Sequence, residues 1–238
     1  MPLPNWDIAL DRLTPDQQEQ VRSRMHPIAC KPRQSLFNQG EPSDSLYVIR
    51  RGRVRLYAGT EHGEEFTLGI MDSGRILGLA AAVLGKPRIV SAESVDHVDA
   101  GILTTKDLHL CMNAIPQFAR NIMTVLATLA VETLDGIVPV ALDSAAVRLA
   151  TILMTLGTPD TNDPSGRRLN VSGLTQEDFG KMVGATRTWV TLTLGTLERN
   201  QLIEKRKGSI TILDRDRLAR FIDAQRSHRT VADRRTSS

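Results

Sequence analysis

The sequence has few cysteines, few aromatic residues and no long apolar run. Only Cys30 and Cys111 are cysteines among 238 residues, and 4% of the residues are aromatic. Two cysteines are too few for an all-cysteine iron–sulfur cluster or a four-cysteine zinc site, and they suit a reducing compartment. No segment approaches the roughly 18 apolar residues of a membrane span, and the N-terminus does not resemble a signal peptide. We therefore expect a cytoplasmic protein with no membrane partner.

Charge is nearly balanced over the whole chain but is unevenly distributed along it. The formal net charge is +3. Residues 141–238 contain 16 Lys and Arg against 11 Asp and Glu, whereas residues 1–140 contain 14 against 16. A basic C-terminal part suits nucleic-acid contact, and a slightly acidic N-terminal part suits a regulatory domain. Charge alone does not decide between this interpretation and an ordinary solvated surface.

Residues 174–202 are typical of two helices joined by a tight turn. Thr175 followed by Asp178 is a variant of the capping box that marks a helix start. Gly184 supplies the positive φ that the turn needs, and Thr186 is expected to cap the second helix. The inward stripe of that second helix comprises Val190, Leu194 and Leu197. An ordinary helical hairpin with a polar outer face is the alternative interpretation of this segment.

A basic hairpin is predicted directly behind the second helix. Two strand-like runs, 202–204 and 209–213, flank a basic turn that ends in Gly208. A charged hairpin beside a helix-turn-helix makes a winged helix, whose wing is suited to contact phosphates. The candidate DNA-contacting residues are Thr175, Gln176, Thr186, Arg187, Thr188, Trp189, Thr191, Leu192, Lys205, Arg206 and Lys207.

The N-terminal half is predicted to hold a helical start and then an antiparallel β jelly roll. Residues 1 to about 30 are expected to be helical, with a start signal at Thr14 and Pro15. From Gly40 to Gly85, glycines recur every eleven or twelve residues, which is typical of turns between short strands. The predicted strands are 46–50, 53–57, 65–70, 89–92 and 98–103.

A long helix with a heptad pattern is expected after Pro116. Its apolar seam suggests pairing with a second copy of the chain, and the alternative is a core helix laid over the jelly roll. The predicted dimerisation residues are Ala119, Ile122, Leu126, Leu129, Thr133 and Gly136. Pro139 is expected to break the helix and to place a hinge at residues 135–143.

The fold class expected from these patterns is α+β, with four parts. They are a helix and β-roll sensor domain at 1–115, a dimerisation helix and hinge at 116–140, a winged helix-turn-helix at 141–224, and a disordered basic tail at 225–238. The last helix of the third part is expected at 218–224.

Several runs of this chain resemble the CRP/FNR family of bacterial transcription regulators, over about residues 36–222. The runs that carry the resemblance are Gly40–Ile49, Gly52–Val54, Thr67–Gly69, Gly85–Arg88, Arg148–Ala150, Leu174–Asp178 and Val183–Arg187. The resemblance implies a cyclic-nucleotide-binding-like β-roll, a homodimer and sequence-specific DNA binding. It also implies double-stranded DNA with a palindromic site and RNA polymerase as partners, and no enzymatic activity.

The effector region departs from the pattern of the members that bind cyclic AMP. Arg88 and Thr133 match the phosphate-binding and adenine-binding positions of those members, whereas Leu79, Ile89 and Leu134 replace polar partners. Unpartnered buried polar groups cost on the order of 1–3 kcal/mol each, so we expect cyclic AMP not to be the effector. The candidate pocket residues are Leu77, Gly78, Leu79, Leu84, Arg88, Ile89, Val90, Met123, Thr133 and Leu134.

Other effectors of the family are also disfavoured by the residues present. The cysteine cluster of the iron–sulfur members is absent, and the haem ligands would fall near Gly78 and Ala80, which cannot ligate iron. The apolar residues of the region leave two possibilities open, a pocket for an apolar ligand or a filled core without one. No metal site is expected, because His62, His97 and His109 stand alone rather than in the His-x-His pattern of a cupin enzyme.

The resemblance assigns a guanine contact to Arg187 and leaves the neighbouring positions unusual. Thr188 replaces the glutamate, and Leu192 the arginine, that the family commonly uses to read bases, and Trp189 is also uncommon. The expected target therefore retains a guanine and differs elsewhere. A haem- or small-ligand-responsive sensor, or a ligand-binding module without DNA activity, are the alternatives that remain.

Overall fold

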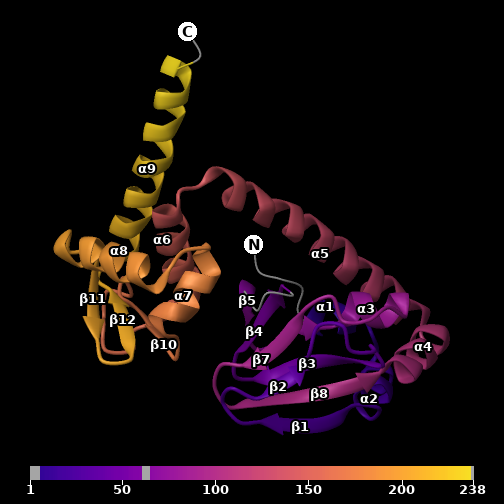
Figure 1. Cartoon of the computed structure of the whole chain (residues 1–238). Coiled ribbons are helices and arrows are strands. Elements are labelled where there is room, and N and C mark those ends of the chain that lie inside the picture. Colours follow the sequence, from indigo (N-terminus) through magenta and orange to yellow (C-terminus); the bar gives the residue numbers. More distant parts are fainter. Residues whose placement is uncertain (1–5, 61–64, 237–238) are drawn as a thin grey trace. The chain divides into compact units, whose positions relative to one another are not determined.

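The computed structural model describes residues 6–60 and 65–236, and the side chains of residues 134–142 and 227–236 lie outside the description. The chain forms two compact units, Met1–Gly136 and Ile137–Ser238 (Figure 1). The combination of a β-rich unit, a long helix and a helical C-terminal unit confirms the α+β class. Within the described residues, no helix combines the length and the apolar content needed to cross a bilayer.

Two four-stranded antiparallel sheets build the first unit. Their orders are β1-β8-β3-β6 and β2-β7-β4-β5. The strands are β1 (His26–Cys30), β2 (Ser35–Phe37), β3 (Ser45–Arg51), β4 (Val54–Gly59), β5 (Glu65–Met71), β6 (Ile76–Leu77), β7 (Ser91–Ser94) and β8 (Val98–Thr104). Buried aliphatic residues from both sheets, including Ile49, Val54 and Ala92, form one core cluster. The five strands predicted from the sequence are all present, with bounds shifted by up to two residues.

The prediction of a helical segment from residue 1 to about 30 is wrong at its end. Helices α1 (Trp6–Leu10) and α2 (Pro15–Arg22) form, and α2 begins at the predicted start signal, where Thr14 also forms a capping box with Gln17. Residues 26–30, however, are strand β1, which pairs with β8. Because β1 is an edge strand of its sheet, Pro27 is tolerated there although it cannot donate a hydrogen bond. The other helices of this unit are α3 (Leu79–Leu84), α4 (Thr105–Ala114) and α5 (Pro116–Leu142).

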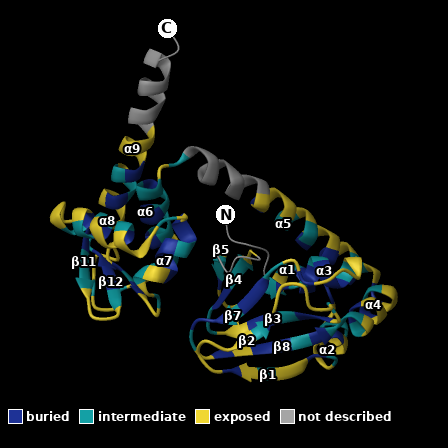
Figure 2. Ribbon diagram, in the orientation of Figure 1, coloured by how far each residue is buried: buried dark blue, intermediate teal, exposed yellow. Residues whose placement is uncertain are grey.

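Helix α5 does not present its predicted seam as one free surface. Ile122 is 1% exposed and packs with Phe118 and Leu108 in the core of its own unit, and Leu126 packs partly against the same core. Among the described residues of the predicted seam, Ile122 is buried, Ala119, Leu126 and Leu129 are half-buried and Thr133 is exposed, while the burial of Gly136 lies outside the description. Part of this face is covered by the β-roll, and pairing with a second copy stays a prediction. The exposed apolar positions lie further around the helix, at Met123 and Val131. The described part of α5 carries both exposed and partly buried residues (Figure 2).

The predicted break at Pro139 is also wrong. Helix α5 continues through Pro139 to Leu142, and the chain leaves helical geometry at Asp143 before Ser144 caps the next helix. A proline removes one backbone hydrogen bond and tends to kink a long helix rather than to end it. The division between the two compact units nevertheless falls inside this helix, after Gly136.

The second unit combines helices with a small antiparallel sheet of order β11-β12-β10-β9. Its elements are α6 (Ala145–Leu156), β9 (Thr158–Pro159), β10 (Leu169–Ser172), α7 (Gln176–Val183), α8 (Arg187–Arg199), β11 (Ile203–Arg206), β12 (Ser209–Ile212) and α9 (Arg215–Thr236). The tail expected to be disordered from residue 225 is a continuation of α9. The reason is visible in the sequence, because no glycine or proline interrupts residues 215–236.

Candidate nucleic-acid interface

The turn between α7 and α8 is fixed by caps on both helices. Thr175 and Asp178 form the reciprocal capping box at the start of α7, as predicted. Gly184 ends α7 with φ +67°, and the Thr186 side chain accepts a hydrogen bond from the Trp189 backbone at the start of α8. These local contacts set where α8 begins and hence which side chains its first turn presents.

A close backbone approach holds the two helices together. A Cβ atom at Gly180 would lie 2.6 Å from the Ala185 carbonyl oxygen, so a side chain at this position would push the turn away. Buried Phe179, Val190 and Leu194 fill the space between the elements. The predicted inward stripe of α8 is therefore confirmed.

Arg148, which sequence reasoning quoted only as part of a motif, anchors the helix pair to α6. Its Nη2 and Nε donate to the Val183 carbonyl at 2.7 and 3.2 Å, and its Nη1 donates to the Asp143 carbonyl at 2.7 Å. The guanidinium thereby satisfies carbonyl groups at the C-terminal ends of α7 and of α5, which lack partners within their own helices. Arg148 therefore ties the C-terminal end of α7 to the segment that leads into α6.

The outer face of α8 presents four side chains together. Arg187, Thr188, Thr191 and Leu192 are all exposed, and Leu192 is 67% exposed. The Thr191 hydroxyl lies 2.5 Å from Gln176 Oε1 and 2.9 Å from the Arg187 carbonyl oxygen. The structure thus places four of the residues predicted on α8 on its exposed face, whereas Trp189 is half-buried, and it connects Thr191 to Gln176, the first residue of α7.

The hairpin of β11 and β12 has the predicted wing geometry, with Gly208 at φ +79° in its turn. Its cations are not equivalent. Lys205 Nζ lies 2.8 Å from Glu198 Oε2, and the Lys205 backbone donates to the same carboxylate. These hydrogen bonds from Lys205 lower the pKa of Glu198.

The other two wing cations differ from Lys205 in their partners. Arg206 pairs with Glu204 at 3.2 Å. Lys207 is exposed at the tip and has no ion pair within the described part of the chain. Lys207 is therefore the wing cation whose charge is least compensated by its own protein.

The predicted effector arginine is buried, and two of its three side-chain nitrogens contact carbonyl groups of its own chain, while Nε has no hydrogen-bond partner among the described residues. Arg88 is 3% exposed, and its Nη2 donates to the Ser45 carbonyl at 2.7 Å. Nη1 lies 3.5 Å from the Gly78 carbonyl oxygen, and the guanidinium lies 4.4 Å from the centre of the Phe37 ring. Burial lowers the pKa of Arg88. Sequence reasoning missed Ser45 and Phe37, which are far from Arg88 along the chain.

The backbone around Arg88 is equally closed. Arg88 exchanges hydrogen bonds with the Gly40–Glu41 turn, at 2.8 Å each. A Cβ atom at Gly78, whose φ is +76°, would lie 2.0 Å from Arg88 Nη1. Glycine at position 78 is therefore what allows the guanidinium to lie flat against the loop.

The apolar residues for which the sequence left open either a ligand pocket or a filled core do not share one environment in this unit. Leu77 and Leu79 are buried in two different core clusters, whereas Leu84 and Ile89 are 67% and 68% exposed. The remaining predicted residues are scattered among these states. Met123 and Thr133 are exposed, Val90 is half-buried, and the Leu134 side chain lies outside the described residues.

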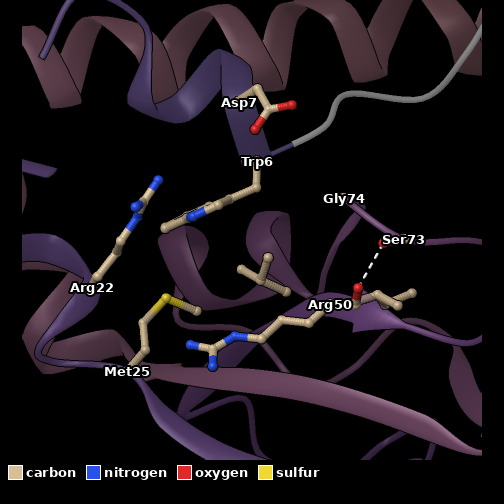
Figure 3. A pocket seen from close by; sticks show the side chains of 9 residues that line it. Trp6, Asp7, Arg22, Met25, Arg50, Ser73 and Gly74 are labelled. Carbon is tan, nitrogen blue, oxygen red and sulfur yellow. Dashed lines mark hydrogen bonds between the residues drawn. The ribbon is translucent and has the colours of Figure 1, made fainter. Parts of the chain in front are cut away.

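A hollow of about 600 Å³ lies elsewhere on the first unit, beside α1, α2 and β3 (Figure 3). The side chains of Arg22, Met25 and Arg50 lie around the indole of Trp6, over buried Val48. None of the predicted effector residues lines it.

Metal ligation finds no support among the side chains that are described. No group of three or more His, Cys, Asp or Glu residues gathers in the described parts of the chain. Cys30 and Cys111 are both buried as free thiols, and burial raises the pKa of each. Both thiols therefore remain protonated and behave as small apolar core residues.

Each of the two units matches the model of a known domain family. Residues 27–114 match the cyclic nucleotide-binding domain, and residues 147–221 match the Crp-like helix-turn-helix domain. The chain is 26% identical over 200 residues to the CRP-like cAMP-activated global transcriptional regulator of Mycobacterium tuberculosis, and the match covers 84% of this chain and 89% of that protein. It is likewise 26% identical over 208 residues to the fumarate and nitrate reduction regulatory protein of Escherichia coli, covering 87% and 81% of the two chains.

Solved structures show the same arrangement of elements. A transcriptional regulator of the CRP/FNR family from Thermus thermophilus aligns with a TM-score of 0.70 and 25% identity, over 84% of this chain and 100% of that one. FixK2 from Bradyrhizobium japonicum aligns with a TM-score of 0.70 and 19% identity, over 82% and 96% of the two chains. The fold is therefore shared with relatives whose sequences have diverged widely.

Proposed function

The chain belongs to the CRP/FNR family of transcription regulators, and on that premise we propose that it acts as a homodimer on a palindromic DNA site, without cyclic AMP as effector. DNA-binding transcription regulation is the function of the family, and the relatives described above are regulators rather than enzymes. The observation that carries the proposal is the exposed face of α8, which presents Arg187 at the N-terminal turn of a firmly capped helix. In helix-turn-helix proteins this end of the second helix enters the major groove.

The proposed division of labour follows the two compact units. Residues 141–224 carry the DNA contacts, and residues 1–115 form the sensor-like β-roll. Helix α5, from residue 116, provides the dimer contact through its exposed apolar positions. RNA polymerase is the further partner that we propose. Selection of bound sequences from a random duplex pool by the full-length protein tests the proposal, because an enriched palindrome supports it and a pool without enrichment contradicts it.

Two-fold symmetry gives the expected spacing of the site. A dimer presents two copies of α8 about one helical turn of DNA apart, roughly 34–36 Å between half-site centres. Each half-site is expected to contain a guanine for Arg187, because a guanidinium can donate two hydrogen bonds to O6 and N7 of that base.

We predict that cyclic AMP does not bind at micromolar concentrations. The Arg88 guanidinium, which would hold a cyclic phosphate, is 3% exposed and donates to the Ser45 carbonyl. Leu79 and Ile89 offer no polar partner to the ribose or the phosphate. Calorimetric titration of the full-length protein should show no binding below about 100 μM, since each lost partner weakens binding by roughly tenfold.

Restoring one of the missing polar groups provides a second test of this prediction. Ile89 is exposed, so Ile89→Ser should fold normally while restoring a hydroxyl beside Arg88. We expect any residual nucleotide affinity to increase in this variant relative to the parent. Micromolar binding by the unmodified chain would contradict the prediction.

The wing is expected to contribute phosphate contacts without sequence preference. We predict that Lys207→Ala reduces the slope of log K against log salt by about 0.9 per protomer, or roughly 2 per dimer, while the selected sequence is unchanged. The exposed Lys106 of α4 provides a matched control, since Lys106→Ala removes the same charge from the other unit. Anisotropy titrations at several salt concentrations measure both. Equal slopes for the two variants would show that Lys207 makes no phosphate contact.

A further inference from the structure

The exposed face of α8 has an unusual composition for a surface that reads bases. It carries one guanidinium, from Arg187, two threonines and a leucine, and no carboxylate or carboxamide among its four exposed positions. Carboxylates accept from cytosine and carboxamides pair with adenine, so neither of these recognition modes is available at these positions. The face therefore offers one guanidinium, which can bind guanine, and the methyl groups of the threonines and the leucine.

Leu192 is the most unexpected member of this face. It is 67% exposed, although its neighbours Val190 and Leu194 on the same helix are almost completely buried. The exposure follows from helical geometry, because Leu192 points to the side opposite the inward stripe and follows Thr188 by one turn. Because Leu192 is 67% exposed, packing within the described part of the chain does not account for an isobutyl group at this position.

The hydroxyl of Thr191 is already engaged. It lies within hydrogen-bond distance of both Gln176 Oε1 and the Arg187 carbonyl. These contacts orient the threonine and leave its methyl group, rather than its hydroxyl, as the free part of the side chain. The centre of the reading face is therefore more apolar than its residue types suggest.

We propose that Leu192 selects thymine by contact with the 5-methyl group, with Thr188 beside it. The inference rests on the proposed DNA-binding function and adds the base class to it. Leu192 follows Arg187 by five residues, or about 7.5 Å along the helix. That length corresponds to about two base-pair steps of roughly 3.4 Å. The thymine thus lies about two base pairs from the guanine that Arg187 contacts, on either strand.

The contact with Leu192 distinguishes thymine from the three other bases only through the 5-methyl group of thymine. A thymine methyl is an established partner of apolar side chains in the major groove. Removing roughly 40 Å² of apolar surface from water corresponds to about a fivefold gain in affinity per half-site. Both half-sites together give about 25-fold.

Replacement of thymine by deoxyuridine tests the proposal, because it removes the 5-methyl group and leaves base pairing intact. Duplexes carrying the selected site are titrated with the full-length protein, with each symmetric thymine pair replaced in turn. At the position two base pairs from the conserved guanine, we expect the substitution to weaken binding about 25-fold. Leu192→Ala should weaken binding to the thymine duplex by a similar factor and should no longer distinguish thymine from deoxyuridine.

Leu110→Ala provides a control, since Leu110 is also an exposed leucine, at 43%, but lies on α4 of the other unit. This variant should keep the full sensitivity to deoxyuridine. If no thymine pair is sensitive in the parent, or if Leu192→Ala stays equally sensitive, the inference is overturned while the proposed function stands. If the parent shows no sequence preference at all, the proposed function itself fails, and the inference falls with it.

Discussion

Replacing Arg187 with alanine should reduce binding of the selected DNA site to the level of non-specific DNA. Arg187 is exposed on the first turn of α8, which the Thr186 cap and the Gly184 turn hold in place. A bidentate contact between arginine and guanine gives about 1–3 kcal/mol of discrimination. Two such contacts per dimer therefore correspond to a loss of roughly 30-fold to 10⁴-fold. Titration of the variant with specific and scrambled duplexes measures this ratio directly.

The appropriate controls separate base reading from charge and from folding. Arg199→Ala removes an exposed arginine at the C-terminal end of the same helix and should retain the sequence preference. Arg187→Lys keeps the charge but cannot make the bidentate contact. It should therefore lose sequence specificity as the alanine variant does, but keep more of the total affinity for DNA. Sedimentation should give the same oligomeric state for all variants. A footprint of Arg187→Ala that still protects the same site would rule out this role.

A charged substitution on the exposed apolar side of α5 should convert the protein to a monomer and weaken DNA binding by more than about 10³-fold. Met123 and Val131 are 59% and 53% exposed in the single chain, and the exposed Ala127 and Ala130 lie between them. A surface of this kind on a long helix is expected to pair with its symmetry mate. Met123→Asp combined with Val131→Asp places four carboxylates in the proposed interface, where burial of an unpaired charge is strongly unfavourable.

The measurement is sedimentation equilibrium, followed by DNA titration of the same samples. Asn113→Asp adds a carboxylate at an exposed position of α4 and should remain dimeric. Ile122 is unsuitable for this test although the heptad pattern singled it out, because it is buried in its own unit and its substitution would unfold the β-roll side. A double variant that sediments as a dimer would show that the copies meet elsewhere.

The features that the sequence predicted correctly are those determined by near neighbours in the chain. The capping box of Thr175 and Asp178, the Gly184 turn and the Thr186 cap each depend on residues within four positions of one another. Residue types at these positions have few alternative structures, so a short pattern is sufficient. The position of Arg187 at the start of α8 follows from them.

The errors concern the partners of residues rather than their local conformation. The spacing of Ile122 indicated a buried face but could not specify whether a second chain or the β-roll would cover it. Strand β1 was missed because its hydrogen-bonding partner β8 lies about 70 residues later. Arg88 was recognised as important, yet its acceptor Ser45 lies 43 residues away and has no pattern that points to it. Tertiary contacts of this kind require the three-dimensional structure.

The hydrogen bond between Arg88 and the Ser45 carbonyl also determines how strongly this β-roll can bind an anion. The Ser45 carbonyl is an intramolecular competitor for the guanidinium, and it is present at a fixed local concentration that no ligand can dilute. If this internal contact is formed about 99% of the time, the apparent dissociation constant of an incoming anion is raised about 100-fold. The competing carbonyl belongs to the backbone, so sensitivity is tuned through its surroundings, for example at Gly78, where an added Cβ would lie 2.0 Å from Arg88 Nη1.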